Sequence, residues 1–178
     1  DESGIVAASA EMRAMARAEN ARATRTLVEL KTVEDTYPLY GALETAPALP
    51  RAALLDQSNG LWGAAAAPEL LTRLGISVGD VLQIGDARFE VRAAIRQEPD
   101  RVGGSGLFSL GLRVLISAAA LPDTALVQPG SLIHYNYRVR LPANVPAGDF
   151  IETLNTDFPD AGWRIRTLDE SSPQLTRL

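Results

Sequence analysis

The sequence contains no cysteine and only one histidine, His134, among its 178 residues. The absence of cysteine excludes disulfide bonds, a cysteine nucleophile and zinc sites built from thiolates. A single histidine excludes a metal site made from several imidazole ligands. The carboxylates nowhere follow the spacing of a calcium-binding loop. The sequence therefore predicts neither a metal site nor a bound cofactor.

Acidic residues outnumber basic ones, 22 to 17, so the formal net charge is −5, and Lys31 is the single lysine among many arginines. A protein that binds nucleic acid needs a basic face to neutralise phosphates, so we expect no nucleic-acid partner. No apolar run approaches the roughly 18 residues of a membrane helix, and neither an initiator methionine nor a signal peptide is present. With 46% hydrophobic residues the chain can bury a core. We therefore expect a soluble piece of a longer protein.

The clearest pattern in the sequence is a short helix followed by a hairpin. Pro68 suits the first helical turn, leucines recur at helical spacing, and Gly75 ends the helix. Gly85-Asp86 is a two-residue loop of the hairpin type between strands at 81–84 and 87–96. Apolar and charged residues alternate in the second of these strands, which predicts one face on a core and one face in water.

Period-two alternation predicts most of the other elements. The stretch 11–18 fits a helix or a strand, and turn residues after it favour a strand paired with 24–33. Further strands are expected at 61–66, 113–116 and 133–141, a helical turn at 52–57, a loop at 44–51, an amphipathic helix at 149–158 and a last strand at 163–167. The final strand–helix–strand order indicates a βαβ unit. The predicted fold class is α+β, with more strand than helix.

No group of residues forms a recognisable catalytic site. His134 shares a polar strand face with Asn136 and Arg138, which is typical of a solvated surface histidine rather than a catalytic base. The glycines of 103–106 match neither a phosphate-binding loop nor a serine nucleophile turn. Glu98, with Asp100 and Arg101 after it, is expected in a solvated loop with weak local ion pairs. The sequence therefore predicts a protein that is not an enzyme and has no catalytic residues.

Three apolar residues on the glycine-rich loop at 102–111 are the candidate contact site. Leu107, Phe108 and Leu110 either pack back onto the core, which is the simpler interpretation, or contact a partner or an apolar cargo. Replacing the three residues with serine should impair transport and partner binding only in the second case.

Several short motifs together resemble one family. They are Thr32-Val33, Tyr37-Pro38-Leu39-Tyr40-Gly41, Glu69-Leu70-Leu71, Leu74-Gly75, Val78-Gly79-Asp80, Ile84-Gly85, Glu98-Pro99-Asp100-Arg101, Arg113-Val114-Leu115-Ile116-Ser117, Val127-Gln128-Pro129-Gly130-Ser131 and Phe158-Pro159-Asp160-Ala161-Gly162-Trp163. The chain resembles the extracytoplasmic domain of FtsX-like or MacB-like ABC transporter permeases, in the YbbP-type branch. The match spans residues 29–173, and its motifs identify a family better than an activity.

The resemblance implies a periplasmic domain, held on the outer side of the bacterial inner membrane between two transmembrane helices. It also implies an α+β porter-like part containing βαβ units, with a smaller, mainly β, sabre-like part inserted in it. We assign residues 1–40 and 113–178 to the first part and 41–112 to the second. Members of the family usually carry a strand and a helix before the first hairpin, for which only residues 1–10 are available here.

The implied function is non-catalytic. The domain would couple ATP hydrolysis by a separate ATPase subunit to periplasmic movement or to export of a lipid, lipoprotein or hydrophobic compound. The implied partners are that ATPase, a periplasmic esterase-like or other protein, an apolar cargo, and a second permease copy. The alternative is a stand-alone module that binds an apolar ligand or lipid, which requires an enclosed apolar pocket of several hundred Å3, on the order of known ligand sites. A hydrolase would require a convergent polar cluster around His134.

Overall fold

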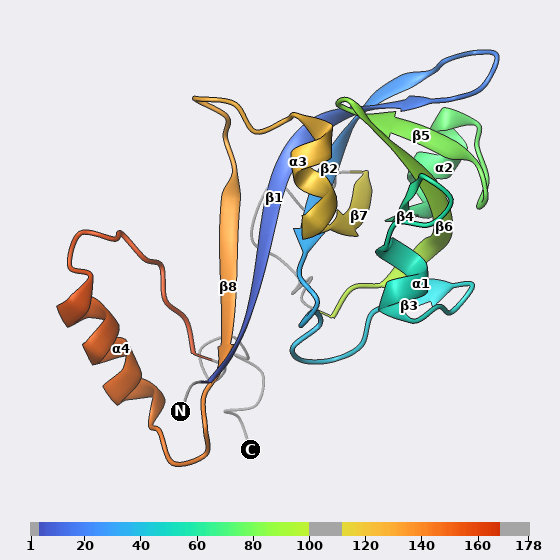
Figure 1. The fold of residues 1–178 in the computed structure, drawn as a ribbon. Coiled ribbons are helices and arrows are strands. Elements are labelled where there is room, and N and C mark those ends of the chain that lie inside the picture. Colours follow the sequence, from blue (N-terminus) through green and yellow to red (C-terminus); the bar gives the residue numbers. More distant parts are fainter. Residues whose placement is uncertain (1–3, 100–111, 168–178) are drawn as a thin grey trace. The chain divides into compact units, whose positions relative to one another are not determined.

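The computed structural model describes residues 4–99 and 112–167. The chain divides into two compact units, one of Val6–Arg138 and the other of Asp1–Ile5 with Val139–Leu178. The first unit holds nearly all the strands (Figure 1), and most of the motifs of the sequence analysis fall within it.

A long hairpin begins the first unit. It consists of β1 (Ile5–Ala18) and β2 (Arg25–Val33), paired antiparallel from Ser9↔Val33 to Arg17↔Arg25. The side chain of Asn20 accepts hydrogen bonds from two backbone N–H groups in the turn. The strand interpretation of residues 11–18 is therefore confirmed, and the strand starts earlier than predicted.

The strand pairings run in a closed circuit. From β2 they pass through β7 (Arg113–Ser117), β4 (Trp62–Ala66), β6 (Ala87–Gln97) and β5 (Val81–Ile84), and they return to β1. The β2–β7 and β4–β6 pairs are parallel and the others are antiparallel. The result is a small barrel, and closure of a sheet in this way removes its exposed edges.

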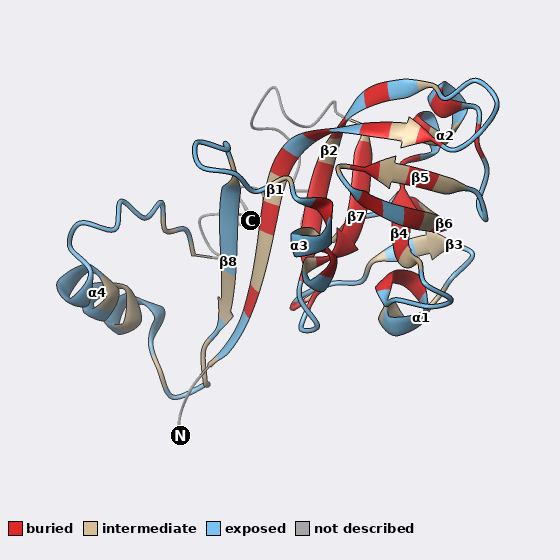
Figure 2. Ribbon diagram, turned by 45° about the horizontal axis from the view of Figure 1, so that its top comes forward, coloured by how far each residue is buried: buried red, intermediate tan, exposed pale blue. Residues whose placement is uncertain are grey.

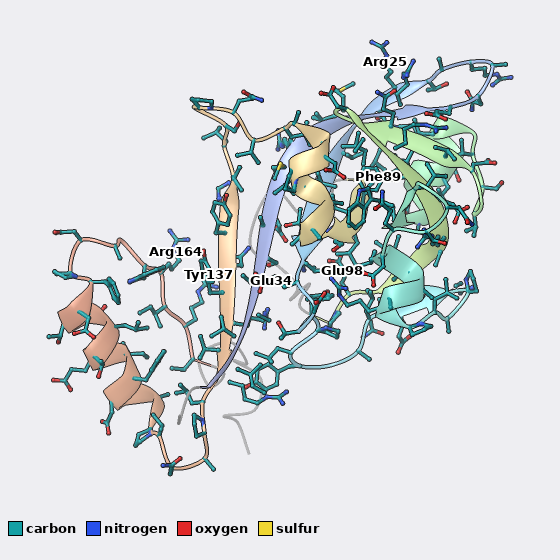
Figure 3. All side chains as sticks on the ribbon, in the orientation of Figure 1. Arg25, Glu34, Phe89, Glu98, Tyr137 and Arg164 are labelled. Carbon is teal, nitrogen blue, oxygen red and sulfur yellow. The ribbon has the colours of Figure 1, made fainter. Side chains whose placement is uncertain are left out.

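The barrel interior is the main core. Its strands alternate apolar residues inward, as the pattern of β6 predicted, and Phe89 lies fully buried inside (Figure 3). The helix α2 (Pro68–Leu74) contributes Leu70 and Leu74 to this core and ends at Gly75, whose φ is 65°. The predicted helix-plus-hairpin module is thus confirmed, and its physical role is to fill and close the barrel.

A second core covers part of the barrel's outer face. The short helix α1 (Arg51–Leu55) packs Leu54 and Leu55 against buried residues of β4, β6 and β7. Figure 2 colours the buried parts of α1 and of these strands red. The strand β3 (Glu44–Ala46) pairs with the end of β6, where the sequence predicted a loop. The three residues of β3 carry no periodic pattern, so only the pairing with β6 defines them as a strand.

Arg92 holds α1 against the barrel. Its guanidinium donates hydrogen bonds to the carbonyl oxygens of Ala53 (3.1 Å), Asp56 (2.6 Å) and Leu61 (3.2 Å). Substitution of Arg92 by Met should lower the free energy of unfolding by about 2–3 kcal/mol, because hydrogen bonds from a charged donor are lost. Chemical denaturation would measure this. The matched change Arg96→Met, at an exposed position of the same strand, should cost under about 0.5 kcal/mol.

The remaining elements follow the barrel in the chain. A 3-10 turn at Ala118–Ala120 leads into α3 (Leu121–Thr124), and then come β8 (His134–Arg140) and α4 (Ala147–Asp157). The expected strand at 163–167 is not formed, so the predicted C-terminal βαβ unit is wrong in its last element. Alternation of apolar and polar residues is not sufficient to form a strand, because the backbone N–H and C=O groups also need hydrogen-bond partners on a neighbouring strand.

Candidate functional site

An open groove lies beside the end of β6. Its volume is about 800 Å3, and both polar and apolar residues line it. They are Ala46, Ala67, Pro68, Glu69, Ala94, Ile95, Arg96, Gln97, Glu98 and Arg113. These residues come from the ends of β3 and β6, the junction of β4 with α2, and the start of β7, so tertiary pairing alone brings them together.

A buried charge cluster lies next to this groove and centres on Glu98 (Figure 3). The Glu98 side chain is 0% exposed. Its Oε2 accepts a hydrogen bond from Nε of Arg113 at 3.0 Å, and its Oε1 accepts one from Nζ of Lys31 at 3.4 Å. Lys31 and Arg113 themselves have side chains only 3% and 7% exposed. The three charges are therefore almost completely removed from water.

The cluster continues outward from Arg113 and Lys31. Nη2 of Arg113 lies 3.3 Å from Oε1 of Glu11, and Nζ of Lys31 lies 4.9 Å from the ring centre of Tyr37. Burial alone would lower the pKa of Arg113, but the carboxylates of Glu98, Glu11 and Glu29 outweigh it and raise this pKa. Arg113 therefore stays a cation. Glu98 and Glu11 match the charges of Lys31 and Arg113, and Glu29 adds a further negative charge near Arg113.

This chemistry is structural. A buried ion pair contributes only when its desolvation is offset by good geometry and further hydrogen bonds, which the cluster provides. Glu98 directly follows β6 and Arg113 begins β7, so the ion pair joins the end of β6 to the start of β7. The acid at the centre of the cluster, Glu98, is 0% exposed, while Glu11 at its outer edge is 34% exposed.

The expectation of a solvated Glu98 is wrong. The Pro99-Asp100-Arg101 run after it suggested a charged surface loop, but Glu98 is buried against partners that lie 67 and 15 residues away in the sequence. Local pattern cannot detect such partners. One available signal was Lys31, because the only lysine of the chain falls within an apolar strand pattern.

Most of the other predicted site residues lie outside the described residues. These are Leu107, Phe108 and Leu110, the glycine-rich run at 103–106, and Asp100 with Arg101. The contact role of the three apolar residues therefore stays a prediction. His134 is exposed on β8, as expected of a surface histidine.

No helix in 4–99 or 112–167 is long and apolar enough to cross a membrane. No three acidic or histidine side chains of these ranges gather as they would around a metal ion. A small cavity beside Tyr37 and Pro38 measures only about 10 Å3, room for one water molecule.

Comparison with known proteins gives one related sequence and several related folds. No family model matches the chain. The chain is 33% identical to the ABC transporter permease YbbP of Escherichia coli (strain K12) over 115 residues, which are 65% of this chain and 13% of YbbP. The matched part of the chain therefore spans about an eighth of this relative's length.

Two solved structures share the fold. The periplasmic region of MacB from Actinobacillus actinomycetemcomitans has a TM-score of 0.55 and 13% identity, over 89% of this chain and 67% of that one. The extracellular domain of the noncanonic ABC-type transporter YknZ from Gram-positive bacteria has a TM-score of 0.53 and 14% identity, over 89% and 78%. The sequence identity to a permease and the shared α+β fold confirm the predicted resemblance: this chain is similar to the periplasmic domains of MacB-like ABC transporter permeases.

Proposed function

We propose that this chain is a non-catalytic extracytoplasmic domain of an ABC transporter permease. The 33% identity to YbbP carries this proposal, and the fold shared with the periplasmic region of MacB supports it. In this role the domain lies on the periplasmic side of the inner membrane. A separate ATPase subunit hydrolyses ATP, and the domain converts the resulting motion into a conformational change that moves a lipid, lipoprotein or other hydrophobic cargo.

The fold fits this role through rigidity rather than chemistry. Closure of the barrel and the buried cluster around Glu98 tie the described strands of the first unit to one another, which supports movement of these strands as one body. β1, β2 and β7 are contiguous in the circuit, and so are β4, β6 and β5. The proposed division into a porter-like part (1–40 and 113–178) and a smaller β-rich part (41–112) rests on the family resemblance alone, because strands of both ranges share one barrel core.

The alternative of a stand-alone apolar-ligand module has less support. It requires an enclosed apolar pocket, whereas the groove in the described part of the chain is open and has charged residues in its lining. A hydrolase has less support again, because the exposed His134 lies on β8 and is not among the groove-lining residues.

The test uses the full-length permease with its ATPase subunit, in a cysteine-free background. Ala21→Cys and Asn155→Cys place one exposed thiol in each compact unit. In cells with a permeabilised outer membrane, a membrane-impermeant maleimide should label both thiols without lysis. With a donor and an acceptor dye on the two thiols, addition of ATP should change energy transfer.

The control is an ATPase subunit that binds ATP but does not hydrolyse it. With this subunit, energy transfer between the two dyes should no longer cycle between two values. Labelling that requires lysis would overturn the periplasmic placement. Energy transfer that never responds to ATP would overturn the coupling role.

A further inference from the structure

The outer face of the β1–β2 hairpin carries arginines around two half-exposed apolar side chains. The strand register places Met15 opposite Leu27, and these side chains are 52% and 50% exposed. The same register places Arg17 opposite Arg25, one step further toward the turn. Residues directly opposite in an antiparallel pair point to the same side of the sheet. They therefore form one patch, the arginine face, which consists of Met15, Arg17, Arg25 and Leu27 with the neighbouring Arg13.

Few carboxylates lie close to Arg17 and Arg25, at the end of the patch nearest the turn. Arg17 donates a hydrogen bond to the neutral side chain of Gln83 on β5. Glu19, in the adjoining turn, accepts two hydrogen bonds from Arg88 (2.7 and 2.6 Å), and these bonds, together with the charges of Arg88 and Arg17, lower its pKa. Glu19 is therefore shared between Arg88 and Arg17. Among the described residues, no carboxylate lies within ion-pair distance of Arg25.

Glu29 is the acid that faces the patch from the other end, where it lies opposite Arg13. The three arginines of this face thus meet two acids, Glu29 and Glu19, and Glu19 is also bound by Arg88, so the face keeps a net positive charge in a chain whose total is −5. The directly opposed Arg17–Arg25 pair is repulsive and lowers the stability of the hairpin. A carboxylate placed between these two guanidinium groups would remove that repulsion.

We propose that the arginine face docks a protein surface that presents carboxylates around an apolar side chain. Guanidinium groups bind carboxylates bidentately, and Arg and Met are enriched in protein interfaces. The partner's carboxylates bind Arg17 and Arg25, and its apolar side chain packs on Met15 and Leu27. The docking face rests on the geometry of the hairpin, so it stands whether or not the domain couples to an ATPase.

The two methionines of the chain provide a direct test. Met12 is 8% exposed in the barrel, and Met15 lies at the centre of the arginine face. With 13C-methyl methionine, the NMR spectrum of the chain contains one reporter signal and one internal control. A synthetic peptide of alternating Glu and Leu should shift the Met15 signal and leave that of Met12 in place. The shift should shrink as the salt concentration rises from about 50 to 500 mM, because salt screens exposed charges.

The variant Arg25→Glu separates docking from folding. It should weaken peptide binding about tenfold or more, since a favourable charge contact becomes a repulsive one. It should not lower the melting temperature, because the introduced carboxylate would face Arg17 as an opposite charge. Arg73→Glu makes the same charge change at an exposed position of α2 and should retain binding.

Three outcomes would overturn the proposal. The first is an equal Met15 shift with a peptide that has Lys in place of Glu. The second is unchanged binding in Arg25→Glu. The third is a Met15 response to phosphatidylglycerol vesicles without a response to the acidic peptide, which would assign the patch to a membrane surface.

Discussion

Replacement of Glu98 by Gln should lower the free energy of unfolding by about 3–5 kcal/mol, as is typical when one partner of a buried ion pair is removed. The amide keeps the size of the side chain and removes its charge, so Lys31 and Arg113 would remain buried as two cations. Urea denaturation followed by tryptophan fluorescence would measure the change. The effect is large because the Lys31 and Arg113 side chains are only 3% and 7% exposed and cannot turn to water without moving strands.

Two further variants show whether charge is the cause. Glu69→Gln makes the same chemical change at an exposed position of the groove and should cost less than about 0.5 kcal/mol. Lys31→Met combined with Glu98→Gln should be more stable than Glu98→Gln alone, because one of the two buried cations is removed. A double variant that is as unstable as the sum of the single changes would contradict the role assigned to the cluster.

Gly85→Ala should destabilise the chain by about 2–5 kcal/mol, the sum of a left-handed backbone penalty and a steric one. Gly85 is the first residue of the turn between β5 and β6, and its φ is 57°. A Cβ at this position would overlap the carbonyl oxygen of Thr124, which also accepts a hydrogen bond from the N–H of Asp86 at 2.9 Å. The substitution would therefore push the hairpin away from α3. Thermal unfolding followed by circular dichroism would measure the loss.

Gly75→Ala is the matched control for this prediction. Gly75 has a similar φ of 65°, but a Cβ there would meet nothing within 4 Å. In this variant the free energy of unfolding should fall only by the cost of the left-handed backbone conformation, about 1–2 kcal/mol. Equal losses for the two variants would show that the contact between the hairpin and Thr124 contributes nothing.

Local pattern was sufficient where an element carries its own signals. The helix that starts at Pro68 and ends at Gly75, and the hairpin around Gly85-Asp86, formed as predicted because start, stop and turn residues act over a few positions. The helix predicted at 149–158 also formed, but none of its residues is buried. Helical periodicity thus predicted an element and not what covers it.

The predictions that were wrong concern residues whose structure depends on strand pairing. The strand β3 is a strand through its bonds to β6, and residues 163–167 have alternation without a strand. Glu98 was assigned to water because the residues after it are charged, whereas its position beside Lys31 and Arg113 depends on the β2–β7 pairing. In each case the deciding partner is distant in sequence.

The sequence by itself determined that the chain offers no thiol chemistry and no multi-histidine site, and that strands outnumber helices. Its short motifs also led to the resemblance to permease domains. Only the tertiary structure decided that these strands close into a barrel, that Glu98 is a buried acid, and that Met15 and Leu27 meet among arginines on the hairpin. The physical reason is range: propensity and periodicity act within a few residues, while ladder partners, burial and charge balance arise from segments that meet only when the chain folds.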